Sequence, residues 1–270
     1  MMKYGNSLVV ALMLLFTLGV TSCMDTDQDF SPEGGGVVEV IREGEMTSFK
    51  DLVGKVVYPT AGSLKSVEEA NKFEAAKSKT AYILYKYENQ QVQNGNIHNV
   101  DLRYAAKLDG NVEIVDRLGA KNDSVSTAAI LSLDQLLTAE EGGRGDLHVM
   151  NNRYLLFGIN YIIAENNHFF TVVYNKEEAA SDDLKLYLRH TGIKEKDGIF
   201  RTAVDYFSVG YPFIYMFTFD MQDVFKDWRS KHPDAKEVNI VVEADVNTLN
   251  SNLNEASSKK QFKTTYKFVD

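Results

Sequence analysis

Cysteine, tryptophan and proline are scarce in this sequence of 270 residues, which has one, one and four of them. The single cysteine, Cys23, cannot form an internal disulfide, so no disulfide framework supports the fold. The sequence also lacks a glycine-rich phosphate loop, a G-x-S-x-G nucleophile elbow and an H-E-x-x-H motif. No catalytic, cofactor-binding or metal-ligating residues are therefore predicted.

Positive charge is in the minority, with 29 Lys and Arg against 38 Asp and Glu. An acidic chain repels phosphate backbones, and no basic cluster in the sequence compensates for this. Nucleic acid is therefore not an expected partner. Repeats with a solenoid or propeller period are also absent from the sequence.

The apolar run from Ser7 to Val20 is too short for a membrane-spanning helix, which needs about 20 residues. It follows Lys3 and fits the apolar region of a secretory signal peptide. The run ends in Val20-Thr21-Ser22-Cys23, which is similar to the lipobox of bacterial lipoproteins, where small residues precede an obligatory cysteine. We therefore expect residues 1–22 to be cleaved off and Cys23 to carry acyl chains that hold the protein on a membrane.

Residues 23–36 are acidic and then glycine-rich, ending in Gly34-Gly35-Gly36. This composition predicts a flexible tether. An acidic run directly after the cysteine resembles the signal that sends lipoproteins of Bacteroidota to the cell surface, so we expect a surface-exposed outer-membrane lipoprotein. A plain solvated spacer, on a lipoprotein that faces the periplasm, is the alternative.

Residues 37–122 have the length and the strand content of a small barrel of the OB type, with about five strands. Thr80 to Tyr87 is a strong strand pattern, and Val112–Val115 is a short strand expected in the same domain. Ser63 to Lys77 instead has helix formers throughout, which predicts one short helix inserted in this barrel.

Residues 147–270 have the pattern of a β-sandwich with about six strands. Arg153–Ile163 and His168–Tyr174 are apolar and aromatic, and Leu184–His190 alternates between apolar and polar side chains. Residues 123–146 are predicted to be a connecting segment. The fold class is therefore mainly β, with a small OB-like barrel followed by a β-sandwich.

This arrangement resembles the NigD-like family of lipoproteins from Bacteroidota. Besides the lipobox and its acidic tail, the resemblance is carried by Thr80–Tyr87, Asn152–Leu155, His168–Phe169, Leu186–His190 and Thr218–Asp220. It covers most of the mature chain in short, degenerate pieces. It implies an N-terminal OB-like domain and a C-terminal β-sandwich, and it brings no known activity or catalytic residue with it.

Two groups of side chains are candidates for chemistry. His168 begins one predicted strand and His190 ends another, so a sandwich would bring them close together. A metal site would need a third ligand at the same depth, so we interpret them as hydrogen-bonding residues at strand ends. Asp205, Asp220 and Asp223 lie near an aromatic stretch and are the carboxylates to test for glycoside hydrolysis, which depends on their separation.

Tyr206, Phe207 and Tyr211 lie in a connection, where packing within a strand does not explain them. They form a candidate surface for stacking on sugar rings or for binding a protein. A loop that closes the end of the sandwich is the alternative. Asp123-Ser124-Val125 resembles the O-glycosylation sequon of Bacteroidota, so Ser124 is a candidate modification site.

These observations favour a non-enzymatic binding or interaction module that is anchored to the membrane through Cys23 and takes a glycan or a protein as ligand. Two alternatives stay open, a periplasmic accessory protein of an envelope complex and a hydrolase with dispersed carboxylates. A deep cleft with two carboxylates about 5 to 9 Å apart would favour the hydrolase. A large exposed apolar patch would favour binding.

Overall fold

The structure is a computed structural model. It describes residues 33–119, 126–134, 136–137, 144–145, 147–163, 168–192, 201–202, 215–250, 253 and 257–268. All of them belong to one unit, Glu33–Asp270. In this part of the chain, neither helix is long and apolar enough to cross a bilayer.

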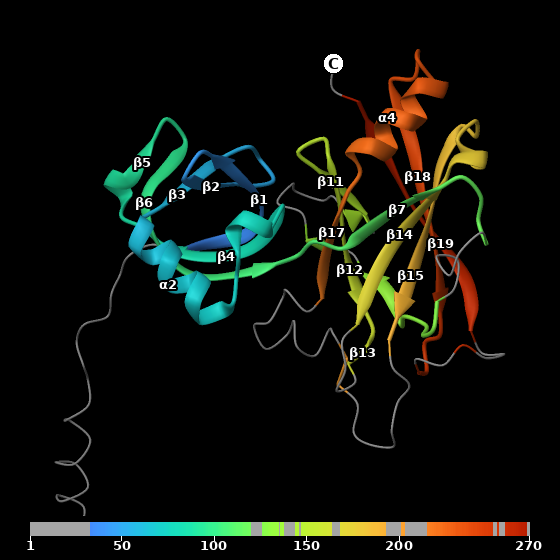
Figure 1. The fold of residues 1–270 in the computed structure, drawn as a ribbon, viewed down its shortest axis with the longest axis horizontal. Coiled ribbons are helices and arrows are strands. Elements are labelled where there is room, and N and C mark those ends of the chain that lie inside the picture. Colours follow the sequence, from blue (N-terminus) through green and yellow to red (C-terminus); the bar gives the residue numbers. More distant parts are fainter. Residues whose placement is uncertain are drawn as a thin grey trace, which may run out of the picture. The chain divides into compact units, whose positions relative to one another are not determined.

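The first sheet closes on itself into a barrel (Figure 1). Its strands lie in the order β3-β2-β1-β4-β6-β5, and β3 also pairs in parallel with β6, so that five of the six form a closed ring. The bounds are β1 Glu33–Glu43, β2 Met46–Lys50, β3 Val56–Pro59, β4 Thr80–Lys86, β5 Val92–Gln93 and β6 Asn96–Lys107. The small OB-like barrel expected from the sequence is thus confirmed.

One helix, α2, spans Ala61–Asn71 and connects β3 to β4. It begins two residues before the predicted Ser63, because Thr60 caps it: the Thr60 hydroxyl accepts from Ser63 N at 3.2 Å. Its end at Asn71 is earlier than the predicted Lys77, and Lys72 there is left-handed with φ 54°. Short 3₁₀ turns follow at η1 Ala75–Lys77, η2 Asn89–Gln91 and, in the sandwich, η4 Lys176–Glu178.

The glycine triplet expected in the tether belongs to β1 instead. Gly34 and Gly35 pair with Tyr85 and Leu84 of β4. A Cβ on Gly34 would lie 2.5 Å from Cζ of Tyr85, and one on Gly35 would lie 2.5 Å from the carbonyl oxygen of Ile83. The barrel therefore uses these glycines for close packing between strand and side chain, which a composition-based tether prediction does not detect.

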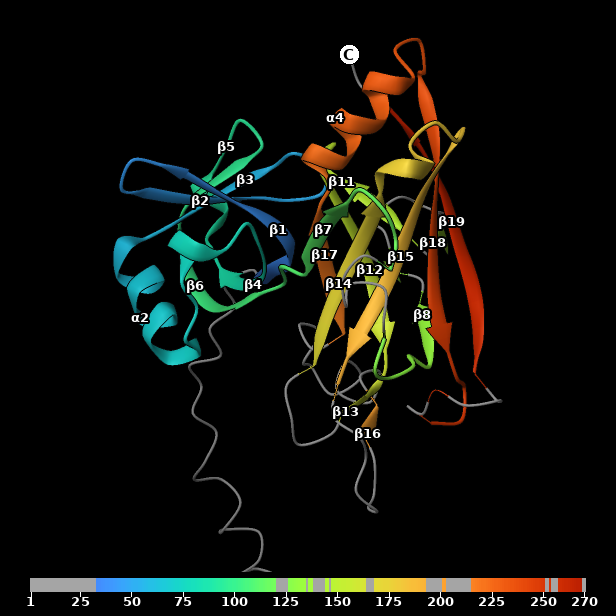
Figure 2. The same ribbon diagram turned by 45° about the vertical axis from the view of Figure 1, so that its right-hand side comes forward.

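The rest of the unit is built on two larger sheets. One has the order β19-β18-β15-β14-β7, which Figure 2 shows side by side, and the other has the order β11-β12-β17 with β8 beside β12. The bounds are β7 Asn111–Val115, β8 Ser132–Asp134, β11 His148–Met150, β12 Tyr154–Asn160, β14 Phe169–Asn175, β15 Asp183–Thr191, β17 Met216–Asp220, β18 Glu237–Val246 and β19 Ser258–Lys267. Two short pairs are β9 Leu136–Leu137 with β10 Arg144–Gly145, and β13 Ile162–Ile163 with β16 Arg201–Thr202.

The strand at Val112–Val115 was expected in the barrel, and this expectation is wrong. As part of β7, it pairs in parallel with β14, so it is an edge strand of the five-stranded sheet. This sequence is too short to specify which strand it pairs with.

A second helix, α4 at Gln222–Lys231, lies in the half of the chain where only strands were expected. Its buried residues, Val224, Phe225 and Trp228, lie on one face at helical spacing. Nε1 of Trp228 donates to the carbonyl oxygen of Ser181 at 3.1 Å, which satisfies the polar atom of a side chain that is 2% exposed.

Candidate functional site

Several residues singled out from the sequence lie outside the described residues and stay predictions: Cys23, Ser124, Asp205, Tyr206, Phe207 and Tyr211. The other candidates, Asp220, Asp223, His168 and His190, are described. The structure brings them into two clusters. Asp220 and Asp223 belong to a charged cleft, and the histidines form a pair.

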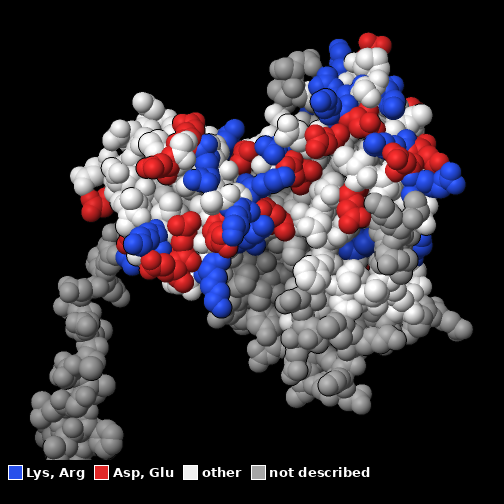
Figure 3. Space-filling view, in the orientation of Figure 1, with Lys and Arg blue, Asp and Glu red and all other residues white. Residues whose placement is uncertain are grey.

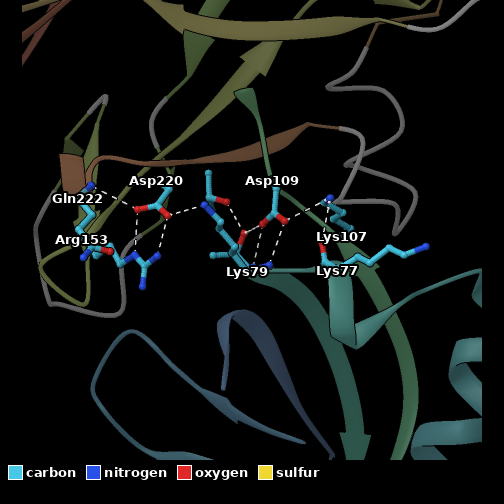
Figure 4. A network of polar contacts seen from close by, with 9 residues as sticks. Lys77, Lys79, Lys107, Asp109, Arg153, Asp220 and Gln222 are labelled. Atoms are coloured by element: carbon cyan, nitrogen blue, oxygen red, sulfur yellow. Dashed lines mark hydrogen bonds and ion pairs between the residues drawn. The ribbon is translucent and has the colours of Figure 1, made fainter. Parts of the chain in front are cut away.

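Asp220, at the end of β17, is the centre of a polar network (Figure 4). Arg153, just before β12, donates to both of its oxygens, from Nε at 2.9 Å and from Nη2 at 2.7 Å. Nζ of Lys79 donates at 2.7 Å, and the backbone N–H of Gln222 donates at 3.3 Å at the start of α4. The bidentate contact with Arg153 fixes the orientation of the Asp220 carboxylate and stabilises its negative charge.

These contacts decide the protonation state of Asp220. Burial alone would raise the pKa of its carboxyl group, but hydrogen bonds from Arg153 and Lys79 outweigh burial and lower the pKa well below its usual range. The hydrogen bond between Arg153 and Asp220 also raises the pKa of the Arg153 guanidinium group. Asp220 is therefore a fixed anion at neutral pH and is unsuited to donate a proton to a leaving group, which a glycosidase acid must do.

A second carboxylate, Asp109, also has hydrogen-bond or ion-pair partners at both of its oxygens. It accepts from the backbone N–H groups of Lys79 and Thr80 at 2.9 and 2.8 Å and from the Thr80 hydroxyl at 2.6 Å. Nζ of Lys107 forms an ion pair with it at 3.4 Å. Lys79 thus lies between the two carboxylates, with its backbone on Asp109 and its ammonium group on Asp220 (Figure 4).

The network joins the barrel to the sandwich, since Lys79 and Thr80 lead into β4 whereas Arg153 and Asp220 flank β12 and β17. Backbone bonds reinforce it: Gly110 N donates to Thr218 O at 2.8 Å, and Thr218 N donates to Leu108 O at 3.0 Å. The hydroxyl groups of Thr80 and Thr218 are also hydrogen-bonded to each other. Side-chain and backbone hydrogen bonds therefore both cross this junction.

The junction borders a cleft of about 500 Å³. Its lining is mostly polar: Lys77, Lys79, Lys107, Asp109, Gly110, Asn111, Val112, Ile114, Arg153, Tyr154, Thr218, Asp220, Gln222, Asp223 and Val224. Figure 3 shows acidic and basic side chains gathered where the barrel passes into the sandwich. The volume falls within the range of about 300–1,000 Å³ that is usual for small-ligand sites.

The predicted proximity of His168 and His190 is confirmed. Nδ1 of His168 lies 2.9 Å from Nε2 of His190, and Nδ1 of His190 lies 3.3 Å from the carbonyl oxygen of Ala129. The rings of Tyr161 and Phe170 pack against the pair. No cluster of three His, Cys, Asp or Glu that could hold a metal exists within the described ranges. The pair's contacts therefore fit hydrogen-bonding residues at strand ends.

This pair gives the fold a pH-dependent stability. Burial, and then the charge of His168, lower the pKa of His190 to about 3, although the bond to Ala129 opposes the shift. The unfolded chain, with a histidine pKa of about 6.5, binds a proton between these values and the folded chain does not. The free energy of unfolding should therefore fall as pH is lowered from about 6.5 towards 3, by up to about 1.4 kcal/mol per pH unit.

Urea unfolding at pH 7, 6 and 5 measures this effect above the range in which most carboxylates titrate. The His190→Gln variant should have a flatter pH profile than the wild type. His98→Gln, which removes an imidazole from a half-buried barrel position stacked on Tyr58, is the matched control. An unchanged slope in His190→Gln would assign the pH dependence to other groups.

Sequence reasoning found Asp220 but missed Lys79, Asp109 and Arg153. Lys79 and Asp220 are 141 residues apart, and no local pattern connects them. One signal was available: Thr80, Arg153 and Asp220 each lie in a short segment that carries the family resemblance.

Comparison with known proteins agrees with the fold. No family model and no curated protein matches the sequence. A predicted lipoprotein from Bacteroides fragilis is similar in structure, with a TM-score of 0.65 and 17% identity over 88% of this chain and 100% of that one. A toxin-related protein from Parabacteroides distasonis has a TM-score of 0.51 and 13% identity, over 87% and 94% of the two chains.

A NigD-like immunity protein from Bacteroides caccae has a TM-score of 0.50 and 9% identity, over 88% of this chain and 97% of that one. The chain has the fold of a NigD-like protein. At these identities the likeness concerns the fold, and it confirms the barrel and sandwich that the sequence resemblance implies.

Proposed function

We propose that this NigD-like chain is a lipid-anchored protein of the cell envelope, and that its barrel and sandwich act as a rigid, non-enzymatic binding module. The observation that carries the proposal is the state of the cleft carboxylates. Asp220 accepts hydrogen bonds from two cations, and Asp109 accepts two backbone bonds and one hydroxyl bond. The lowered pKa of Asp220 keeps this carboxylate ionised, so it positions the cations beside it and is unsuited to act as a general acid.

The envelope location rests on the sequence and on the neighbours. The lipobox before Cys23 supports lipid anchoring, and the acidic residues after it support display on the cell surface. The structural neighbours include a predicted lipoprotein and an immunity protein from Bacteroides species. A periplasmic accessory role is the alternative, and the face of the outer membrane that carries the protein distinguishes the two.

Protease treatment of intact cells tests the location of this module on the cell surface. With a tag at the C-terminus, we expect the tag to be lost within minutes while a periplasmic marker protein survives. Protection of the tag until the outer membrane is opened would contradict surface display and support the periplasmic alternative. Binding screens with glycans and secreted proteins would follow a surface result.

Lipid attachment needs its own control in this experiment. Cells fed an alkyne-labelled fatty acid should label the wild-type protein, whereas Cys23→Ala should carry no label, because the thioether sulfur is lost. Ser22→Ala keeps a small residue before the cysteine and should be labelled like the wild type. Label on Cys23→Ala would place the anchor elsewhere in the chain.

A further inference from the structure

The charged groups of the cleft are not equally accessible. The side chains of Lys77, Lys79 and Lys107 are 72%, 58% and 51% exposed, whereas those of Asp220 and Asp109 are 16% and 15% exposed. The carboxylates lie beneath and the ammonium groups lie above them. A ligand that enters the cleft therefore meets the ammonium groups before it meets Asp109 or Asp220, although the whole chain has a net charge of −9. Two exposed carboxylates oppose this positive charge: Asp223 on the cleft wall, and Glu74, whose Oε2 forms an ion pair with Nζ of Lys77 at 2.6 Å.

The positive groups are also held in place before any ligand arrives. Asp220 fixes the ammonium group of Lys79 and the guanidinium group of Arg153. Lys107 is positioned by Asp109 and by the carbonyl oxygen of Lys77, to which its Nζ donates at 3.2 Å. Side chains ordered in advance lose less entropy on binding. Each ammonium group has three N–H donors, so one ion pair does not exhaust its capacity.

The remaining lining indicates the kind of anion. Asn111 and Gln222 contribute exposed amide groups, which suit the hydroxyl groups of a sugar. Val112 and Ile114 contribute small apolar surfaces, and Ile114 is 38% exposed. A protein partner would instead be expected to bury large aromatic anchors at the centre of its interface.

We propose that this cleft binds an acidic polysaccharide, through carboxylate or sulfate groups placed on Lys77, Lys79, Lys107 and Arg153. The inference rests on the proposed function, because it names the ligand class of that binding module. Asp223, an exposed carboxylate in the first turn of α4, lies on the cleft wall and opposes such a ligand.

The test uses the full mature lipoprotein in detergent and measures Kd for three polymers. Polygalacturonate offers only carboxylates, dextran sulfate only sulfates, and dextran neither. Binding to either acidic polymer, with dextran at least about tenfold weaker, supports the proposal and identifies the acidic group. Because surface ion pairs are screened, affinity should also fall as salt is raised from 50 to 300 mM. Equal binding of all three polymers, or of none, overturns the proposal.

Variants locate the site. Lys77→Gln with Lys107→Gln should weaken binding about tenfold, a change of about 1.4 kcal/mol. The same lysines changed to arginine should keep it. Lys259→Gln with Lys263→Gln removes equal charge from exposed positions on β19 and should change Kd less than twofold. Asp223→Asn should tighten binding two- to threefold. Thermal melting checks that every variant is folded.

An unchanged Kd in the Lys77 and Lys107 variant, or the same loss in the β19 control, would overturn the cleft as the site. Either result leaves the proposed function standing, because it concerns the ligand site and not the anchor or the surface display. Protection of the tag in the protease experiment would have the opposite consequence. It would remove surface display without changing the affinities measured on the purified protein.

Discussion

The Asp220→Ala variant should lose about 3 kcal/mol of unfolding free energy, because removing this mostly buried carboxylate leaves two cations without their partner. Two cations, on Arg153 and Lys79, depend on this one carboxylate, and so does the N–H of Gln222. Water at Arg153, which is 35% exposed, and at Lys79 limits the loss to the lower end of the usual range.

Denaturant unfolding at pH 7 measures this change, with Asp223→Asn as the control. Asp223 lies three residues away and loses the same charge, but it is exposed and should cost less than about 0.5 kcal/mol. Because the pKa of Asp220 is lowered in the folded protein, its contribution is present above the unfolded carboxyl pKa and is lost as pH falls below it. A loss equal to that of Asp223→Asn would mean that the network adds no net stability.

The parts of the fold that could be predicted are those that local sequence specifies. The alternation in Leu184–His190 gives the buried Leu184, Leu186 and Leu188 of β15, because successive side chains of a strand point to opposite faces. The helix formers after Ser63 give most of α2. Number and type of strands were sufficient to predict a barrel and a sandwich, because both architectures bury one face of short strands.

The parts that could not be predicted depend on distant partners. β7 belongs to the sandwich because it pairs in parallel with β14. Gly34 lies in a strand at a position where the ring of Tyr85 leaves no space for a side chain. α4 was missed although Val224, Phe225 and Trp228 have helical spacing, since ten residues give a weak signal among strands. The cleft also could not be predicted, because its charged residues have no distinctive local pattern in the sequence. They come together only where the barrel meets the sandwich.

The junction itself should respond to one added side chain, because Gly110→Val is expected to cost about 3 kcal/mol by overpacking. A Cβ at Gly110 would lie 2.3 Å from Cε1 of Phe219, whose ring is fully buried and stacked on Phe157 at 4.9 Å. The backbone cannot move away easily, since Gly110 N donates to Thr218 O at 2.8 Å. Gly62→Ala, with open space around it in α2, is the control and should be neutral or slightly stabilising.

Pairing the change with a smaller partner separates steric strain from other causes. In a double-mutant cycle, Gly110→Ala combined with Phe219→Leu should be more stable than the sum of the single changes predicts, by about 1 kcal/mol. Leucine removes the ring atoms that the new Cβ would meet. Additive effects would show that the strain lies in the backbone and not against the ring.

The cleft gives an independent readout, because Gly110 and Thr218 both line it. If the junction positions the cleft's cations, Gly110→Val should weaken binding of an acidic polymer even under conditions where the variant is fully folded.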